Sequence, residues 1–255
     1  MRDPHVVWVR YRLEADPHVT FENPPPIEWE TDTFRMRLAE GIATFEMREH
    51  FPSVQEARNA VEVLLRSWEI DTGLRYGTRE IHFRYEDSKL IDRNPPPPGT
   101  VQVVTASATL RAYWALTAIA HVRRKAYPQP PQHFRVSPDV ETMWHRYEGY
   151  VEGREPISSM AYFCLTVLEA RAGNRVRAAR EYGISKNVLG ELGKLTSERG
   201  DAKSARKMSP RLRPLTSKEA TWIEAVVKAI IRRVGERKAK TPLPTIMMKD
   251  LPSLD

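Results

Sequence analysis

The sequence predicts an α+β protein in two parts: an N-terminal, mainly antiparallel sheet with one packed helix, and a C-terminal helical bundle. Apolar residues alternate along several segments of the first hundred residues, and they recur at three- and four-residue spacings after Ser137. Two proline-rich segments interrupt the chain between these patterns. We therefore predict a β-rich domain with one helix at residues 1–127, a Pro-rich linker at 128–136, and a basic helical bundle with an extended tail at 137–255.

The N-terminal strands are predicted from period-two alternation, the pattern of a half-buried strand. It covers residues 7–13 and 81–85, and it covers both arms of a hairpin over residues 34–47 that turns at Glu40-Gly41. Residues 23–26 carry three consecutive prolines, so they form a loop or an edge rather than a central strand.

One helix is predicted inside the N-terminal part. Ser53 and Glu56 have the spacing of a capping box, which satisfies free backbone amides of the first helical turn. The apolar residues within 57–68 share one stripe that packs across the sheet. Residues 94–99 then predict a polyproline II spacer. Residues 101–125 carry both strand and helix signals, and we favour strands that complete the sheet.

The C-terminal part is predicted to contain five helical segments. Their boundaries are indicated by capping residues, prolines and glycines: Ser137-Pro138, Pro156, Gly173, Gly183, Ser185 and the capping box Thr216–Glu219. The segment after Pro156 has the broadest apolar face and is the predicted central helix. The tail over 241–255 is predicted either to pack back as an extended strap or to be offered as a peptide to a partner.

The positive charge of the chain is concentrated in its second part. The net charge is +7, with 13 basic and 18 acidic residues in 1–100 (−5) and 27 and 15 in 101–255 (+12). Residues 171–240 alone hold 19 basic and 7 acidic residues (+12). This asymmetry indicates a polyanionic partner such as RNA, DNA or an acidic protein. The alternative is a set of solvated helix faces.

Residues 177–192 resemble a helix-turn-helix. Ala179 stands where the two helices must approach closely, Gly183 at the turn, and Ile184, Leu189 and Leu192 at buried positions. The resemblance implies that the first turn of the second helix faces a DNA groove, with residues Ser185, Lys186, Asn187 and Gly190. The alternative is that two short helices joined by a glycine are part of an ordinary bundle, and few side chains here can read bases.

A second basic pattern lies in the loop that follows. Small residues alternate with Lys and Arg over 197–213, and guanidinium groups bind phosphate bidentately. The alternative is a solvated loop at the negative end of a helix dipole. The candidate nucleic-acid-binding residues of both patterns are Arg175, Arg177, Arg180, Lys186, Asn187, Arg199, Lys203, Arg206, Lys207, Arg211 and Arg213.

The C-terminal part also resembles the HEPN-type helical domains of bacterial conflict systems. The resemblance rests on a long apolar helix with Tyr162-Phe163 and Leu168-Glu169, a helix that ends in a basic loop, and a long closing helix. It implies a bundle that handles RNA and often dimerises. The whole chain is similar to an uncharacterised bacterial two-domain family.

The ribonuclease motif of HEPN-type domains is absent. That motif is an Arg followed a few residues later by a His. Here Arg199 is followed by Lys203 and Arg206, and no histidine follows His145. The resemblance therefore implies a domain without catalytic activity.

Other chemistries find little support in the sequence. The single cysteine, Cys164, lies in an apolar helical face, the setting of an inert thiol. No metal-ligand spacing, glycine-rich phosphate loop or nucleophile elbow occurs, so we expect no catalytic residues, no metal and no cofactor. No apolar run approaches the roughly 18 residues of a membrane span, and one cysteine excludes a disulfide framework. We expect a cytoplasmic protein without membrane contact.

These observations favour a non-enzymatic protein that contacts nucleic-acid phosphates through its basic bundle. Two alternatives remain open. One is an interaction or scaffold subunit of a bacterial assembly, such as a phage-defence system, with an acidic protein partner or a homodimer. The other is a helix-turn-helix regulator that binds DNA.

Overall fold

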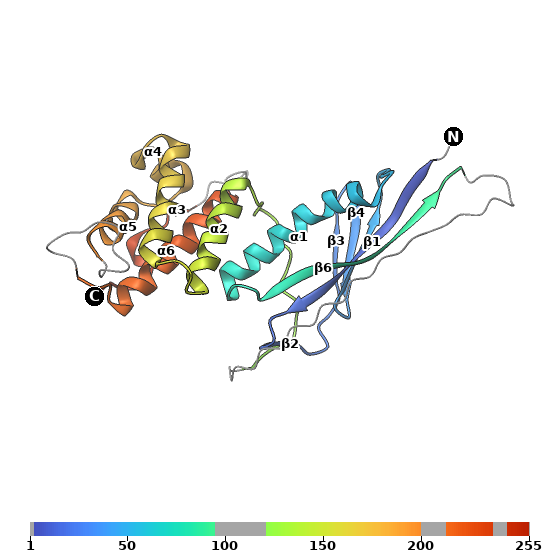
Figure 1. The fold of residues 1–255 in the computed structure, drawn as a ribbon, viewed down its shortest axis with the longest axis horizontal. Coiled ribbons are helices and arrows are strands. Elements are labelled where there is room, and N and C mark those ends of the chain that lie inside the picture. Colours follow the sequence, from blue (N-terminus) through green and yellow to red (C-terminus); the bar gives the residue numbers. More distant parts are fainter. Residues whose placement is uncertain (1–2, 95–120, 200–212, 237–243, 255) are drawn as a thin grey trace. The chain divides into compact units, whose positions relative to one another are not determined.

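The computed structural model describes residues 3–94, 121–199, 213–236 and 244–254 (Figure 1). It confirms the α+β class, with a five-stranded antiparallel sheet and a helix followed by a helical region. Two compact units are formed. The first comprises Met1–Leu65 and Arg79–Gln129, and the second comprises Arg66–Thr78 and Pro130–Asp255. The second unit thus begins inside the predicted linker, and it also takes in a segment that we had assigned to the N-terminal domain.

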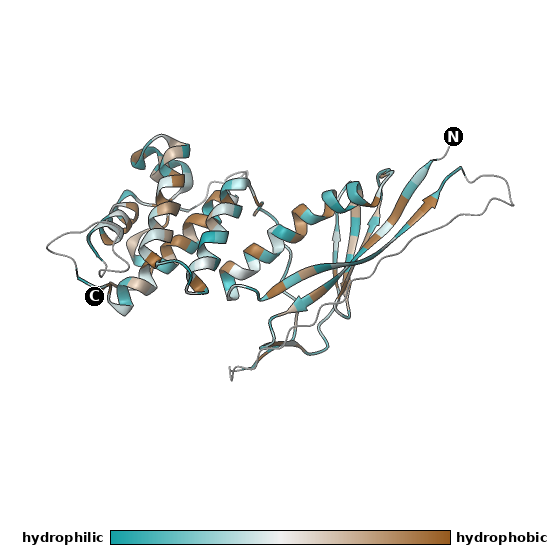
Figure 2. Cartoon of the chain, viewed as in Figure 1, coloured by the Kyte–Doolittle hydropathy of each residue, from teal (hydrophilic) through white to brown (hydrophobic). Residues whose placement is uncertain are grey.

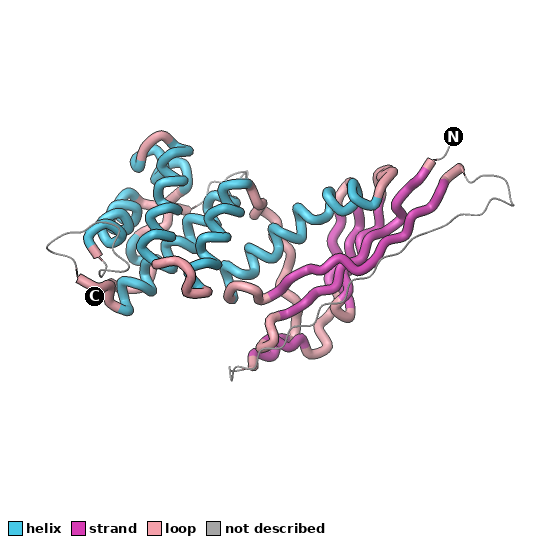
Figure 3. Tube along the Cα trace, viewed as in Figure 1, coloured by secondary structure: helices cyan, strands magenta, loops and turns pink. Residues whose placement is uncertain are grey.

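The main sheet of the first unit has the strand order β3-β4-β5-β1-β6, and every neighbouring pair is antiparallel. Figure 3 shows the strands in magenta and the helices in cyan. The predicted hairpin is confirmed as β4 and β5, with Phe34 opposite Met47 and positive φ at Glu40 and Gly41 in the turn. Hydrophobic and polar residues alternate along the strands (Figure 2). The strands are β1 (Pro4–Ala15), β3 (Ile27–Glu30), β4 (Phe34–Ala39), β5 (Ile42–Met47) and β6 (Ile81–Asp92).

Helix α1 (Val54–Tyr76) covers one face of this sheet with its first half. Ser53 begins it as predicted: its hydroxyl accepts the Glu56 amide at 3.2 Å and donates to the Glu56 carboxylate at 2.9 Å. The hydroxyl of Tyr11 on β1 donates to Glu62 of the helix at 3.0 Å. The covered face carries the buried residues of the strands, including Val9, Met36 and Phe45.

The second half of α1 belongs to the helical unit, which the sequence pattern did not indicate. The hydroxyl of Ser67 accepts the backbone amide of Val136 at 3.1 Å, and Arg66 binds Glu141 of the next helix. Gly73 lies directly against the ring of Trp144. Small residues on this half of α1 therefore permit close packing against α2 within the second unit, so the two halves of one helix serve two different cores.

Only the end of the ambiguous segment 101–125 is described. Residues 101–120 lie outside the described residues. Val122–Arg124 form a strand, β7, but it does not extend the main sheet as we had expected for this segment: it pairs in parallel with β2 (Val19–Phe21) in a separate two-stranded sheet. Arg124 is held there by the buried carboxylate of Glu80.

The helical unit contains the five predicted helices. They are α2 (Pro138–Val151), α3 (Ile157–Ala172), α4 (Arg175–Tyr182), α5 (Lys186–Glu198) and α6 (Ser217–Glu236). The hydroxyls of Ser137 and Ser185 cap α2 and α5 as predicted, and Thr216 and Glu219 form the reciprocal capping box before α6. Helix α3 contacts the other four helices and carries the most central apolar residues of this core, which confirms its predicted place.

The described part of the tail packs back onto the helical unit. Ile246 pairs with Ile184 as a parallel bridge, donating to the carbonyl of Gly183 at 2.8 Å and accepting from Ser185 at 2.9 Å. A 3-10 turn, η1 (Met248–Asp250), follows, and Ile246, Leu251 and Leu254 pack against the core. Of the two predicted arrangements, the strap is the one present in residues 244–254.

Candidate nucleic-acid interface

Helices α4 and α5 are two short helices joined by a tight turn at Gly183, an arrangement that fits both a helix-turn-helix and an ordinary bundle. Gly183 ends α4 in the left-handed conformation, with φ 60° and ψ 43°, and the next helix begins three residues later at Lys186, after the Ser185 cap. The three predicted buried positions, Ile184, Leu189 and Leu192, are at most 1% exposed. Ala178 and Tyr182 of α4 complete the apolar contact. This packing fixes which sides of the two helices face outward.

Four candidate residues lie on those outward sides. Arg177 and Arg180 of α4, and Lys186 and Asn187 in the first turn of α5, are exposed. Within the described residues, none of the three cations has a carboxylate partner. Arg177 and Arg180 are three residues apart, so their side chains leave the same side of α4. The positive charge of these three side chains is therefore available to a partner on this side of α4 and α5.

Arg175 is placed differently, although it begins the same helix. Its guanidinium binds Glu169 of α3 at 2.5 Å and lies over α5, where a Cβ at Gly193 would be 2.9 Å from Nη2. The side chain thus links three helices, and a phosphate would have to compete with Glu169 for it.

Arg199 and Arg213 both bind the buried carboxylate of Glu219. The distances are 3.1 and 3.2 Å, and the amide of Thr216 donates to the same carboxylate at 2.8 Å. Burial by itself would raise the pKa of Glu219, but the Thr216 hydrogen bond and the two guanidinium groups lower it overall. Arg199 and Arg213 also form a parallel bridge. They fasten the two described ends of the basic loop to α6.

The remaining candidates, Lys203, Arg206, Lys207 and Arg211, lie outside the described residues. Several described cations of the basic segment that were not candidates have partners. Arg171 binds Asp139, Arg232 lies 3.7 Å from Asp71, and Arg233 binds Glu236 and the carbonyl of Pro244. The count of charges along the sequence therefore overstates the charge that the helical unit can offer to a polyanion.

The described residues contain no group of three or more His, Cys, Asp or Glu side chains that could hold a metal ion. Cys164 is fully buried in α3, and this burial raises the pKa of its thiol to about 12. A thiol in that state is a poor nucleophile at neutral pH. In the described part of the chain, no helix combines the length and apolar character that crossing a membrane would require.

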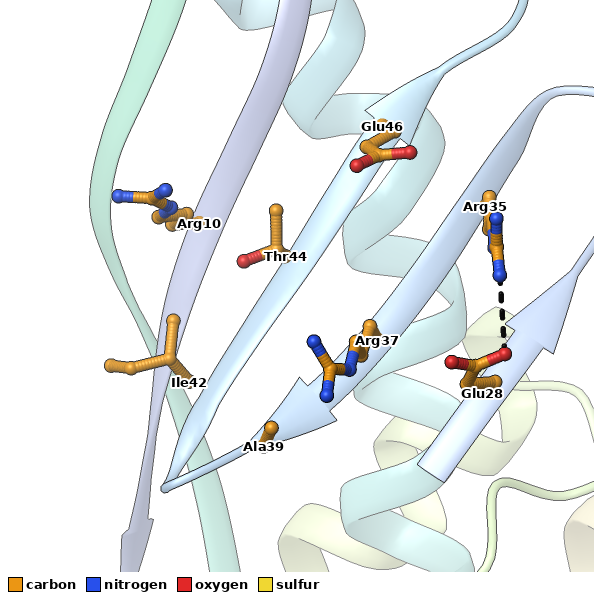
Figure 4. A pocket seen from close by; sticks show the side chains of 8 residues that line it. All are labelled: Arg10, Glu28, Arg35, Arg37, Ala39, Ile42, Thr44 and Glu46. Atoms are coloured by element: carbon orange, nitrogen blue, oxygen red, sulfur yellow. Dashed lines mark hydrogen bonds and ion pairs between the residues drawn. The ribbon is translucent and has the colours of Figure 1, made fainter. Parts of the chain in front are cut away.

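One group of polar residues was missed by the sequence reasoning. The face of the main sheet opposite α1 carries arginines from β1 and β4, and a hollow of about 550 Å³ lies among them (Figure 4). The available signal was the alternation of Arg35 and Arg37 with buried residues on β4, and of Arg10 and Arg12 on β1. We had used it only to predict strands.

Comparison with known protein families, with characterised proteins and with solved structures finds no match to this chain.

Proposed function

We propose that this protein binds RNA or DNA without catalysing a reaction, through the outward side of α4 and the first turn of α5. The observation that carries the proposal is the exposure of Arg177, Arg180 and Lys186 without carboxylate partners among the described residues. Neighbouring cations such as Arg175 and Lys194 are ion-paired, so among the described residues of α4 and α5 a phosphate backbone would meet these three free.

The local geometry suits contact with phosphates more than with bases. Lys186 and Asn187 stand at the N-terminal end of α5, where the helix dipole favours an anion. Further along α5, the outward positions are Gly190, Glu191 and Lys194, and the last two are paired with each other at 3.6 Å. This stretch offers few groups that read base edges, so binding is expected to depend weakly on sequence.

The HEPN-type resemblance favours RNA over DNA as the natural ligand. This preference for RNA is part of the proposed function. Binding by the loop over 200–212 belongs to the same proposal, because Arg199 and Arg213 hold its two ends in place at α6.

Salt-dependent binding tests the proposal. The affinity of the full chain for a duplex DNA and for a single-stranded RNA is measured at several salt concentrations. Arg177→Ala/Arg180→Ala should reduce the slope of log K against log salt by about 1.8 on duplex DNA, since each phosphate contact contributes about 0.9. The control Arg12→Ala/Arg154→Ala removes two exposed cations that already have glutamate partners, and it should leave the slope nearly unchanged. Absence of binding at low salt, or equal slopes in both double variants, contradicts the proposal.

A second candidate is an acidic protein partner. The observation that favours it is the exposure of Val176 on α4 and of Met247 and Met248 on the tail that pairs beside the turn. Apolar side chains near cations suit a peptide better than a phosphate backbone. Titration with polyglutamate of matched charge separates the two: binding tighter than that of the oligonucleotide, and lost in Arg177→Ala/Arg180→Ala, favours the protein partner.

A further inference from the structure

The exposed face of the main sheet carries a second group of arginines, one of which, Arg37, has no carboxylate partner among the described residues. A hollow of about 550 Å³ is lined there by side chains from β1, β3, β4 and β5 (Figure 4). This volume is in the range of small-molecule sites, roughly 300–1,000 Å³. The hollow belongs entirely to the first unit and is separate from α4 and α5.

The strand register places two arginines on either side of a threonine. Arg37 of β4 is directly opposite Thr44 of β5, and Thr44 is directly opposite Arg10 of β1. Adjacent strands are about 4.8 Å apart, so the two arginines leave the sheet about 10 Å from each other with a hydroxyl between them. In Figure 4 the Arg10 guanidinium is directed away from Thr44, so this side chain must turn to meet an anion above Thr44, which its length allows.

The charge of Arg37 is not neutralised within the described residues. Glu28 is its direct cross-strand neighbour, yet the Glu28 carboxylate binds Arg35 at 3.2 Å (Figure 4). Other arginines of this face differ, because Arg12 binds Glu86 and Arg84 binds Glu14. The row across the sheet therefore leaves one guanidinium without a partner.

Arg10 is oriented but still able to donate. Its guanidinium stacks on the ring of Trp8, with Cζ 4.1 Å from the ring centroid. The nearest oxygen of Asp87 is 4.0 Å away, which is beyond hydrogen-bonding distance. The N–H donors of the stacked group therefore remain available, and arginine binds oxyanions well through such donors.

We propose that this hollow binds the phosphate group of a small organic phosphate. A nucleoside monophosphate is a ligand whose size suits the volume of the hollow. Arg10 and Arg37 hold the phosphate from two sides, and the hydroxyl of Thr44 donates to it from below. Ala39 and Ile42 at one end of the hollow supply apolar surface for the rest of the ligand, and Glu46 at the other accepts from its hydroxyl or amino groups.

The carboxylates beside Thr44 favour a small phosphate ester over the phosphates of a nucleic-acid backbone as the ligand. Glu46 lines the same hollow, and the charge of Arg35 is taken up by Glu28, so a second phosphate of a nucleic-acid backbone would meet a carboxylate rather than a free cation there. A single phosphate at Thr44 avoids this repulsion. The ligand is therefore a phosphomonoester rather than a polymer.

Calorimetric titration of the full chain with AMP, adenosine, inorganic phosphate and a single-stranded oligonucleotide without terminal phosphates tests the proposal. AMP should bind and adenosine should not, and inorganic phosphate should bind more weakly than AMP. Arg37→Ala should weaken AMP binding about tenfold or more, Arg37→Lys should weaken it less, and Thr44→Val should weaken it several-fold. Thermal unfolding of each variant confirms that it folds.

Two controls separate this site from other effects. Arg84→Ala removes an exposed charge of the same face outside the hollow and should change AMP affinity less than twofold. Arg177→Ala/Arg180→Ala should not change AMP affinity, so the two proposals can fail independently. Equal losses in Arg37→Ala and Arg84→Ala, AMP binding no tighter than adenosine binding, or Arg37-dependent binding of the oligonucleotide alone would overturn the proposal.

Discussion

Gly73 of α1 lies against the indole ring of Trp144 in α2, so closely that a Cβ on residue 73 would be 2.5 Å from Cη2 and 2.8 Å from Cζ2 of the ring. Trp144 is 2% exposed and cannot move aside without disturbing its neighbours. The absence of a side chain at one helical position thus sets the distance between two helices of the second unit.

Gly73→Ala should therefore destabilise the protein. Alanine gains about 1 kcal/mol over glycine within a helix, but forcing a methyl group into a packed contact costs about 1–3 kcal/mol or more, so the overlap outweighs the gain. Gly190→Ala on α5 is the matched control, because no atom lies within 4 Å of its Cβ position. In denaturant unfolding, Gly73→Ala should lower the free energy of unfolding, and Gly190→Ala should raise it by about 0.5–1 kcal/mol. A stabilised Gly73→Ala variant would contradict the packing.

Glu219→Gln should reduce the free energy of unfolding by about 2 kcal/mol at pH 7, because the buried carboxylate accepts two charge-assisted hydrogen bonds. The folded protein holds the pKa of Glu219 below its ordinary value of 4.5. The contribution is therefore complete above pH 4.5 and is lost as the pH falls through the lowered pKa. Unfolding curves of wild type and variant should converge in acid; a constant difference from pH 7 to pH 3 would exclude this titration.

The burial of His5 predicts a second pH dependence of the stability, in this case between pH 7 and 5. Its ring is buried and stacks on His50 at 5.4 Å, and its pKa is lowered by burial, by the charge of Arg93 and by His50, against a smaller opposing effect of Asp3. The unfolded chain binds a proton more readily, so stability is complete above pH 6.5 and decreases as the pH falls below it. His5→Phe keeps an aromatic ring and should remove this part of the dependence between pH 7 and 5, as measured by urea unfolding.

Ile246→Ala should cost about 1–2 kcal/mol, since the side chain is partly buried against the helical core and the backbone pairs with Ile184. Met248→Ala, two residues along and exposed, should be nearly neutral. Thermal unfolding compares the two. If both variants unfold like the wild type, the tail contributes nothing to the stability of this unit.

Local signals were sufficient for most of the secondary structure. Ser53, Ser137 and Ser185 each satisfy a backbone amide within the next three residues. Pro138 and Pro156 stand where α2 and α3 begin, and Gly173 and Gly183 end α3 and α4 in the left-handed conformation. Such effects act over a few residues, so they can be predicted from neighbouring letters. The same holds for the hairpin at Glu40-Gly41 and for the central position of α3.

Long-range pairing decided the candidate sites. Arg199 and Glu219 are 20 residues apart in sequence, and Arg10 and Arg37 are placed around Thr44 only by the register of three strands. A basic residue looks the same in the sequence whether it is free, as Arg177 is among the described residues, or bound to a distant carboxylate, as Arg175 and Arg213 are.

The sequence by itself determined the α+β class, the points at which most of the helices begin and the excess of positive charge in the second part, because these follow from composition, periodicity and capping. The tertiary structure alone decided that α1 serves two units, that the tail packs beside Gly183, and which cations remain unpaired. Those outcomes depend on side chains that are distant along the chain and meet only when the core packs, and local residue preferences do not specify such meetings.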